Sequence, residues 1–405
     1  MAGKSYIECS TNWKRPNLTQ SPELFQQVAK LLQEVETGGD LAIDSLSKRF
    51  DGFQPRRIAL KPYRDYALDP QLLNSIEQAG QRIEAFCTLQ KETLQPQQIE
   101  EANGVFGFQY SPIEAIGAYI PGGRFPLIST ALMTLMPARV AGCERRVACS
   151  PSVHPAILAA ASLAGATEFW HIGGAQAVAA MALGYQNLQP VQMIVGPGNQ
   201  YVNVAKQLLQ SRIKIDVAAG PSELLILANA EVNQEWLIAD MAAQAEHDPQ
   251  AQSLLVSDDD SFLRSIEQQL MNSDELRALL ASEQIVLLQA RHVDDMIKFS
   301  NRYAPEHLLL ADARIQAEQL KHYGSLFIGQ NSAVAFGDYC AGPNHTLPTM
   351  GSANRSSGLC VQSFMNIQSY QQVTDAGCKQ LAEIGRPLAE AEQLVWHERS
   401  MQVRS

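Results

Sequence analysis

Glu306 and His307 place a carboxylate and an imidazole side by side, directly after Pro305. Both groups exchange protons, and imidazole does so near neutral pH because its unperturbed pKa is about 6.5. A pair of this kind can provide general-base catalysis. Adjacent Glu-His pairs are nevertheless more often part of a solvated surface, so the interpretation depends on the other residues that the fold brings near.

A second candidate is Gln244, followed by His247 and then by Asp248-Pro249. Gln244 and His247 are three positions apart, so on a helix both side chains lie on one face and can reach one site. Histidine is the commonest transition-metal ligand, whereas glutamine is a weak neutral oxygen donor. Considered alone, the stretch is better explained as a helix end terminated by Asp-Pro, with a metal site as the less favoured alternative.

Residues 337–349 are rich in turn-forming types, yet they include Asp338 and His345, seven positions apart. Loops of this content are often functional. Cys340 beside them is interpreted as a small buried thiol. Near the end of the chain, Glu392 and His397 are five positions apart and would not share a helix face well. From periodicity alone, His397 is predicted to be a solvated surface histidine.

Two glycine-containing loops could bring the backbone close to a ligand. Residues 117–123 read Gly-Ala-Tyr-Ile-Pro-Gly-Gly, and residues 196–201 read Gly-Pro-Gly-Asn-Gln-Tyr. Neither is the G-x-G-x-x-G fingerprint, because Tyr201 stands where the third glycine is needed. Turns between strands and helices use glycine for steric reasons in any case, so these loops indicate a dinucleotide site only weakly.

From Glu114 onward, short β-rich runs alternate with Ala-rich helical runs, which is typical of parallel α/β architecture. The first series comprises strands 116–120, 147–149, 169–172 and 193–195, with helices 129–141, 154–163, 175–183 and 200–210. The second comprises strands 224–227, 254–256, 285–288, 307–310 and 326–328, with helices 234–247, 262–281 and 293–303. We therefore predict an α/β fold with two incomplete, duplicated, Rossmann-like parallel-sheet domains. Residues 20–103 read mostly as helix, and after a loop-rich stretch a helical tail covers 374–399, so helical extensions flank both domains.

The composition of the 405-residue chain, with 46% hydrophobic and 18% charged residues, predicts a soluble globular protein. A formal net charge of −11 disfavours partnership with nucleic acid or an anionic membrane. No apolar run approaches the ~20 residues of a membrane span, and residues 1–5 lack the core of a secretory signal. Seven cysteines without a C-x-x-C pair fit reduced thiols, so a cytoplasmic location is predicted.

Taken together, seven stretches of this chain resemble the histidinol dehydrogenase family. They are residues 117–123, 173–177, 194–199, 216 with 219–223, 244–249, 303–308 and 344–349. They occur in the family's order, and the resemblance covers the chain from about residue 20 to its end. The combination is far more specific than any of the motifs alone.

The resemblance implies one zinc ion per site. The metal ligands of the family fall here on Gln244, His247, Asp338 and His397. Because the tail histidine of the family usually comes from the other subunit, the resemblance also implies a homodimer with shared active sites. It therefore replaces the interpretation of His397 as a surface residue.

The family's catalytic pair falls on Glu306 and His307. Further substrate contacts fall on Ser129, Ser222, His345 and Glu392, in addition to His307 and the four metal ligands. Contacts to the nicotinamide cofactor fall on Tyr119, Gln176 and Asn199, none of which needs a G-x-G-x-x-G loop.

The implied reaction is the last step of histidine biosynthesis, in which L-histidinol is oxidised through the aldehyde to L-histidine with two NAD⁺ and water. His307 would accept the alcohol proton as hydride leaves, and Glu306 would activate water toward the aldehyde. Zinc would hold the imidazole and amino nitrogen of the substrate, which orients the carbinol carbon. The expected division is an N-terminal helical segment (1–105), a cofactor-side domain (106–220), a domain with the metal and the catalytic pair (221–360) and a tail at the dimer site (361–405).

A related zinc- and NAD-dependent dehydrogenase that acts on a small polyol or a sulfonated diol, such as dihydroxypropanesulfonate, is the alternative. That relative shares the zinc pattern and the Glu-His pair, and its glycine loop can read as residues 122–126 do here, Gly-Gly-Arg-Phe-Pro. The segment 109–115 also lacks the basic residues that are frequent in the histidinol dehydrogenase family. Ser129, Ser222 and Glu392 favour the amino alcohol.

Overall fold

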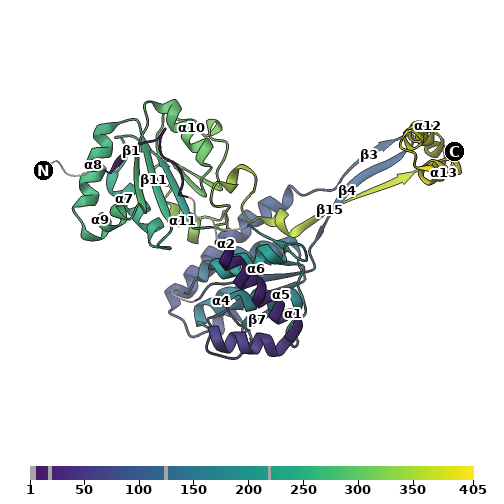
Figure 1. Ribbon diagram of the computed structural model, residues 1–405, viewed down its shortest axis with the longest axis horizontal. Helices are drawn as coiled ribbons and strands as arrows, with labels where there is room; N and C mark the ends of the chain where they lie inside the picture. The colour runs from purple at the N-terminus through teal and green to yellow at the C-terminus, as the bar shows by residue number, and fades with distance from the viewer. Residues whose placement is uncertain (1–5, 17–20, 123–125, 218–219) are drawn as a thin grey trace.

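The computed structural model describes residues 6–16, 21–122, 126–217 and 220–405. Within them, the strands form two six-stranded sheets and one three-stranded sheet (Figure 1). This is the predicted pair of Rossmann-like parallel-sheet domains. Gly123, Arg124, Phe125 and Ala219, which belong to the sequence motifs, lie outside the described residues.

The first sheet has the order β2-β7-β6-β5-β8-β9 and is parallel except for β2, which runs antiparallel to β7. Its strands are β2 (Arg56–Ile58), β7 (Glu168–His171), β6 (Arg145–Ser150), β5 (Ala115–Tyr119), β8 (Met193–Val195) and β9 (Lys214–Ile215). Alternate side chains of β5 and β6 enter two separate cores, one on each face. The helices on one face are α1 (Pro22–Phe50), α5 (Gly174–Leu183) and α6 (Gln200–Leu209), and those on the other are α2 (Pro70–Glu92), α3 (Ile128–Ala141) and α4 (Pro155–Leu163).

The second sheet has the order β1-β12-β11-β10-β13-β14, and every pairing in it is parallel. Its strands are β1 (Ile7–Cys9), β12 (Ile285–Gln289), β11 (Gln252–Ser257), β10 (Glu223–Leu227), β13 (His307–Leu310) and β14 (Ser325–Ile328). The associated helices are α7 (Gln234–Ala245), α8 (Asp260–Met271), α9 (Asp274–Ala281), α10 (Val293–Tyr303) and α11 (Val334–Tyr339). The helix expected over 262–281 is interrupted, because Ser273 caps the N-terminus of α9.

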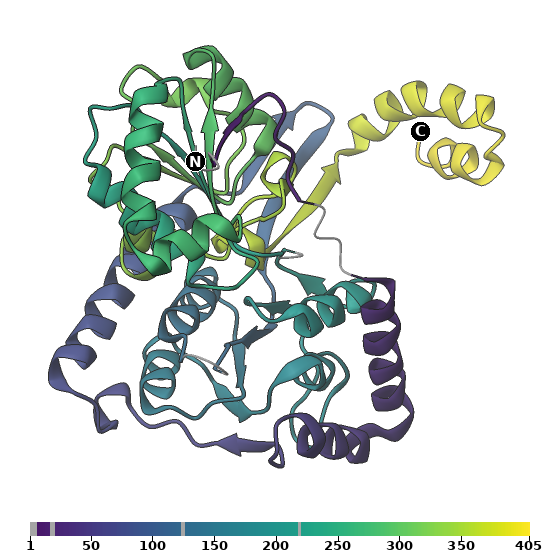
Figure 2. The same ribbon diagram turned by 60° about the vertical axis from the view of Figure 1, so that its left-hand side comes forward.

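The third sheet forms an arm that sequence reasoning missed. Its antiparallel strands are β3 (Gln97–Glu101), β4 (Gly104–Pro112) and β15 (Met365–Val373). The arm ends in α12 (Asp375–Ala391) and α13 (Val395–Gln402), which stand apart from both domains in Figures 1 and 2. The predicted helix up to residue 103 is therefore wrong for β3, which is a strand. The predicted loop before residue 374 is wrong for β15, which is also a strand. Both strands are mostly exposed on both faces, so no apolar alternation marks them.

The expected N-terminal segment contacts both domains. Its β1 pairs with β12 at the edge of the second sheet, whereas α1 packs on α5 and α6 of the first. The division of the chain into domains near residues 105, 220 and 360 stays a prediction.

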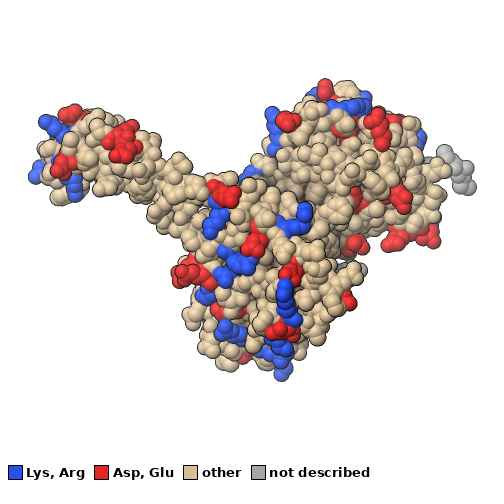
Figure 3. All heavy atoms as spheres, turned by 180° about the vertical axis from the view of Figure 1, so that it is seen from behind, with Lys and Arg blue, Asp and Glu red and all other residues tan. Residues whose placement is uncertain are grey.

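The surface of the described residues carries charges of both signs. Figure 3 shows Lys and Arg interspersed with Asp and Glu over the face that it presents. The seven cysteines are free thiols, as the sequence predicted. None of the helices in the described part of the chain is long and apolar enough to cross a membrane.

Candidate active site

The expected catalytic pair and three of the four expected metal ligands lie at one edge of the second sheet. Glu306 immediately precedes β13, while Gln244 and His247 lie at the end of α7, which leads into β11. Asp338 lies in the last turn of α11, which follows β14 and returns across the sheet. In parallel α/β units a helix returns to the starting edge of the sheet, so all four residues gather at the N-terminal ends of the strands.

The junction between α10 and β13 orients Glu306. Ala304 ends α10 in the left-handed conformation, with φ of 49°, which is uncommon for a residue with a side chain. Pro305 then prevents the helix from continuing. One oxygen of the buried Glu306 carboxylate, Oε2, accepts hydrogen bonds from Ser222 Oγ at 2.6 Å and from the Glu223 backbone N–H at 2.8 Å. Ser222 therefore lies beside the Glu306 carboxylate.

His307 is buried beside two carboxylates. Its Nδ1 lies 3.2 Å from the Glu223 carbonyl oxygen, which can only accept, so this contact places the proton of neutral imidazole on Nδ1. The other nitrogen, Nε2, lies 3.6 Å from Asp338 Oδ1 and is left as the basic atom. Burial lowers the pKa of His307, but the charges of Glu306 and Asp338 outweigh burial and raise it to about 9. With this pKa the ring carries a proton on both nitrogens at neutral pH, and a cation at Asp338 would lower the pKa and free Nε2 as a base.

Gln244, His247 and Asp338 are the three expected metal ligands that lie at this edge of the second sheet. His247 Nε2 lies 3.9 Å from Asp338 Oδ2, which is too long for a hydrogen bond and leaves room for an ion between the two. Gln244 is only 2% exposed, and its Nε2 atom has no hydrogen-bond partner among the described residues. The two ends of an amide are nearly isosteric, so a half-turn presents Oε1 at that position as a metal ligand.

The described residues contain no group of three or more His, Cys, Asp or Glu side chains arranged to hold a metal ion. This is consistent with the expected ligand set, because Gln244 is not of those types and His397 lies elsewhere. Of the four expected ligands, only His247 and Asp338 are of these residue types and lie at this edge within one chain.

The loop that carries His345 joins the two domains at this edge. His345 Nδ1 donates to the Asp338 backbone carbonyl at 2.8 Å, and Asn344 Nδ2 donates to the Met133 carbonyl of α3 at 2.6 Å. Burial lowers the pKa of His345, so its ring favours the neutral state. Ser129 lies in the first turn of α3, four residues before Met133. The loop thus connects the helix of Ser129 to the residues around Asp338.

The expected cofactor residues lie at the C-terminal ends of the strands of the first sheet, whereas the residues described above lie at the N-terminal ends of the strands of the second. Tyr119 ends β5, and Asn199 follows β8, at the point where the strand order reverses. Open α/β sheets bind ligands at such a reversal. Asn199 is exposed, and its Oδ1 caps α6 by accepting from the backbone N–H groups of Tyr201 and Val202.

Tyr119 and Gln176 are held inside the protein at this edge. The Tyr119 hydroxyl accepts from Gly174 N–H at 3.2 Å, and burial raises its pKa to about 12. Gln176 is 1% exposed and donates through Nε2 to Asp51 Oδ2 at 3.0 Å. The same oxygen accepts from Gly173 N–H at 3.1 Å.

A buried ion pair supports the loop that carries Asn199. Lys206 and Asp216 have side chains that are each 1% exposed, with Nζ 2.5 Å from Oδ1. Lys206 also donates to the Gly196 carbonyl at 2.9 Å, and Asp216 accepts from Gly196 N–H at 2.7 Å. Gly196 has φ of 110°, and a Cβ there would lie 2.2 Å from the Tyr119 carbonyl oxygen. The turn therefore requires glycine.

Glu392 and His397 are not brought to this site within one chain. Glu392 follows α12 and His397 lies on α13, so both are at the tip of the arm (Figures 1 and 2). Both are exposed, and the neighbouring Trp396 is 82% exposed.

Several residues that support the site were given no individual role in the sequence analysis, although two of them lie within the family motifs; they are Arg15, Asp51, Lys206, Glu223 and Asn344. Lys206 carried a signal, because it lies four positions after Val202 on the apolar face of an amphipathic helix. For the other four residues, no local sequence pattern indicates which side chain or backbone group each one contacts.

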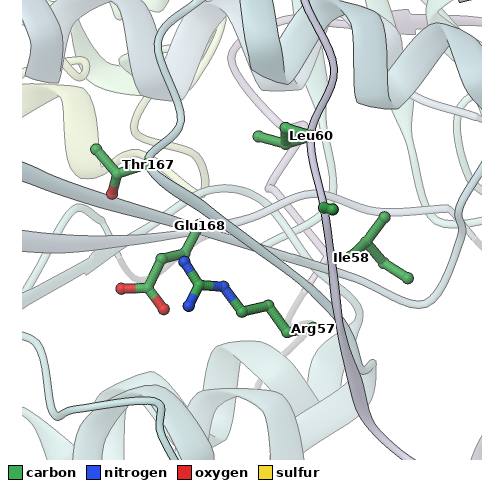
Figure 4. A pocket seen from close by; sticks show the side chains of 6 residues that line it. Arg57, Ile58, Leu60, Thr167 and Glu168 are labelled. Carbon is green, nitrogen blue, oxygen red and sulfur yellow. The ribbon is translucent and has the colours of Figure 1, made fainter.

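Two surface cavities in the described residues lie at the other edge of the first sheet. One of about 280 Å³ is bounded by β2 and the start of β7, and Figure 4 shows Arg57 and Glu168 pointing toward each other there. The other, of about 350 Å³, includes Pro112, Lys214 and Asn366 at the base of the arm. Neither is lined by an expected site residue.

Comparisons with known proteins identify the family of this chain. The family model described as histidinol dehydrogenase matches residues 14–405. The histidinol dehydrogenase of Thermus thermophilus is 38% identical over 409 residues, which covers 98% of each chain. That of Methanothermobacter thermautotrophicus is 39% identical over 402 residues, which covers 94% of this chain and 93% of its own.

The same family is found among solved structures. The crystal structure of histidinol dehydrogenase from Elizabethkingia anophelis matches with a TM-score of 0.90 and 34% identity. The match covers 98% of this chain and 97% of that one. With a family model over nearly the whole chain and relatives of this identity, the chain belongs to the histidinol dehydrogenase family of oxidoreductases.

Proposed function

We propose that the protein is a zinc-dependent enzyme that oxidises L-histidinol to L-histidine through the aldehyde, with two NAD⁺ as hydride acceptors. The observation that carries this proposal is the convergence of a proton-transfer pair and three expected metal ligands on one sheet edge. That edge is tied by residues 344–345 to α3 of the domain with the expected cofactor residues.

The residues present fit a zinc ion. Gln244, His247 and Asp338 would hold it, with His397 of a second copy as the fourth ligand, which gives the mixed nitrogen and oxygen set that zinc accepts. The buried Gln244 amide end without a partner supports this assignment, since such a group is costly unless it is satisfied. When bound, zinc supplies a Lewis acid that orients the substrate nitrogens.

His307 would act as the base for alcohol oxidation. The Glu223 carbonyl holds the proton on Nδ1, so Nε2 is free to take the proton of the substrate hydroxyl. The proton leaves oxygen while hydride leaves carbon toward NAD⁺, in each of the two oxidation steps.

Glu306 would act as the base for hydration of the aldehyde. Its Oε2 accepts hydrogen bonds from Ser222 and from the Glu223 N–H, whereas Oε1 accepts no hydrogen bond from the residues that the structure describes. That second oxygen would take a proton from the water that attacks the aldehyde carbon. Ser129, Ser222, His345 and Glu392 would bind and orient the substrate.

Glu392 and His397 would reach the site of a second copy, so the enzyme would be a homodimer with two shared sites. The exposed position of both residues at the arm tip supports this arrangement. We also infer a cytoplasmic location, because all seven cysteines are free.

The decisive assay follows NADH formation with L-histidinol, before and after treatment with a chelator and after readdition of zinc. Two NADH per L-histidinol, lost with the chelator and restored by zinc, are expected. Dihydroxypropanesulfonate serves as the competing substrate. NADH from the diol and none from L-histidinol would replace this function with the alternative.

The shared site has its own test, which mixes two inactive variants, His247→Asn and His397→Asn. A mixed dimer would have one site with both substitutions and one with neither. Random reassortment would therefore restore roughly a quarter of wild-type activity, because half of the dimers are mixed. No recovery after verified subunit exchange would exclude a tail ligand supplied by the partner.

A further inference from the structure

The backbone of Glu223, the first residue of β10, contacts both members of the catalytic pair. Its N–H donates to Glu306 Oε2 at 2.8 Å, and its carbonyl accepts from His307 Nδ1 at 3.2 Å. The parallel register places Leu224 opposite His307. A displacement of Glu223 would therefore disturb the carboxylate and the imidazole together.

The side chain of Glu223 is fixed by a buried ion pair with Arg15. Arg15 Nε lies 2.7 Å from Glu223 Oε1, and the Glu223 side chain is 3% exposed. The other oxygen, Oε2, accepts from Arg15 Nη2 and from the Met350 backbone N–H, each at 3.2 Å. One carboxylate thus joins the N-terminal segment, the start of β10 and the end of the loop that carries His345.

Arg15 also contacts the chain just before the catalytic pair. Its Nη2 donates to the Tyr303 carbonyl at 2.7 Å, and the guanidinium carbon lies 3.9 Å from the centre of the Tyr303 ring. A Cβ on Gly351 would lie 2.6 Å from Arg15 Nη1, so only glycine leaves room for the guanidinium. Stacking and a two-pronged contact to a carboxylate are specific to arginine.

We propose that Arg15 and Glu223 form a positioning pair that holds Glu306, His307 and the loop of His345 in their working arrangement. The effect of this pair on kcat rests on the proposed function. Its effect on the positions of Glu306 and His307 is independent of that function. Neither residue touches the expected metal ligands Gln244, His247 or Asp338 through a hydrogen bond found in the described residues, so metal binding is expected to be independent of the pair.

The pair acts as a unit because each charge is buried against the other. Removal of Arg15 would leave the Glu223 carboxylate without its cation in a dry environment, which is worse than removal of both charges. Misplacement of catalytic groups by about 1 Å can lower turnover about 100-fold. The loss should therefore appear in kcat rather than in KM.

The kinetic test compares Glu223→Gln, Arg15→Met, Arg15→Lys and the double variant Arg15→Met/Glu223→Gln in the zinc-loaded enzyme. Each single exchange is expected to lower kcat about 10- to 100-fold with zinc content and KM nearly unchanged. Arg15→Lys should lose less than Arg15→Met, and the double variant should be no worse than the worse single variant. Arg264→Met, which breaks an exposed pair with Asp260, is the matched control and should keep full activity.

A second measurement does not require the proposed function. Diethyl pyrocarbonate acylates unprotonated imidazole nitrogens, and peptide mass spectrometry reports the extent at each histidine. Release of the His307 ring in Glu223→Gln should raise its acylation severalfold, while His292, exposed at the start of α10, stays unchanged.

The outcomes separate the two proposals. Wild type without activity on L-histidinol but with the expected change at His307 would overturn the proposed function and keep the positioning pair. Active wild type with unchanged kcat in the variants, or unchanged acylation of His307, would overturn the positioning pair. Equal increases at His307 and His292 would indicate general unfolding and would also count against it.

Discussion

The expected site residues lie at opposite edges of the two parallel sheets. The first sheet presents the expected cofactor residues at the C-terminal ends of its strands, where the strand order reverses between β5 and β8. The second presents Glu306, His307 and the expected metal ligands at the N-terminal ends. Only the first follows the general rule for open α/β sheets.

Helix dipoles give a physical reason for the difference. The first edge carries the N-termini of α3, α5 and α6, whose partial positive charge suits an anionic dinucleotide. The second edge carries the C-termini of α7, α10 and α11, whose partial negative charge suits a cation. Two domains of similar architecture can therefore favour ligands of opposite charge, because one domain presents helix N-termini at its candidate site and the other presents helix C-termini.

The C-terminal edge of the second sheet is occupied by the protein's own charges. Arg314 pairs with Asp258 at 2.7 Å and with Asp312 at 2.6 Å, and Asn229 Nδ2 donates to Asp312 at 3.2 Å. These residues follow β11, β13 and β10, where the strand order of this sheet reverses. At the position that would ordinarily bind a ligand, these side chains pair with one another.

The largest effect is expected at the metal-binding edge. His247→Asn should abolish bound zinc and turnover together, because it removes one of the few strong ligands. Zinc is measured by mass spectrometry of the dialysed protein and turnover by NADH formation. His292→Asn, an exposed histidine in the same domain, is the control. A zinc-free but active His247→Asn enzyme would contradict the assignment of this edge.

The next effect separates the two members of the catalytic pair. Glu306→Gln should slow oxidation of the aldehyde by about 100- to 10,000-fold, the usual contribution of a general base, and should spare alcohol oxidation more. Single-turnover assays that start from the alcohol or from the aldehyde measure the two halves. Equal losses in both would show that Glu306 has no separate duty.

At the cofactor edge the expected effect is on stability. Lys206→Met leaves Asp216 buried without its cation and should lower the free energy of unfolding by about 3–5 kcal/mol. The double variant Lys206→Met/Asp216→Leu should recover much of this loss, since it removes both charges. Urea denaturation followed by fluorescence measures it. Full additivity of the two substitutions would mean that the pair does not act as a clamp on the Gly196 turn.

The smallest effect is expected at the C-terminal edge of the second sheet. Arg314 is about half exposed, and the buried Asp312 would keep its hydrogen bonds from Asn229 Nδ2 and from the backbone N–H of residue 314, so Arg314→Met should lower the free energy of unfolding by only about 1–2 kcal/mol. Its kcat and KM should match wild type. A selective loss of kcat in Arg314→Met would show that both edges of the second sheet take part in the reaction and would break the comparison.

Local sequence patterns predicted most of the two parallel sheets. The strands 193–195 and 307–310 and the helix 293–303 are observed with the expected bounds. Buried strands with continuous apolar runs and helices with clear caps carry strong local signals. The arm carried none, because β3 and β15 are solvated on both faces and find their pairing only with β4.

The sequence by itself determined the alternating α/β order, the acidic balance and the chemical types available at residues 244–247 and 306–307. Only the tertiary structure decided that α7, α10 and α11 end at the same edge and that Arg15 reaches Glu223 across more than 200 positions. The physical reason is that side-chain type and periodicity are local properties. Which strand ends meet, and which charge is buried against which, depends on long-range packing that no local pattern records.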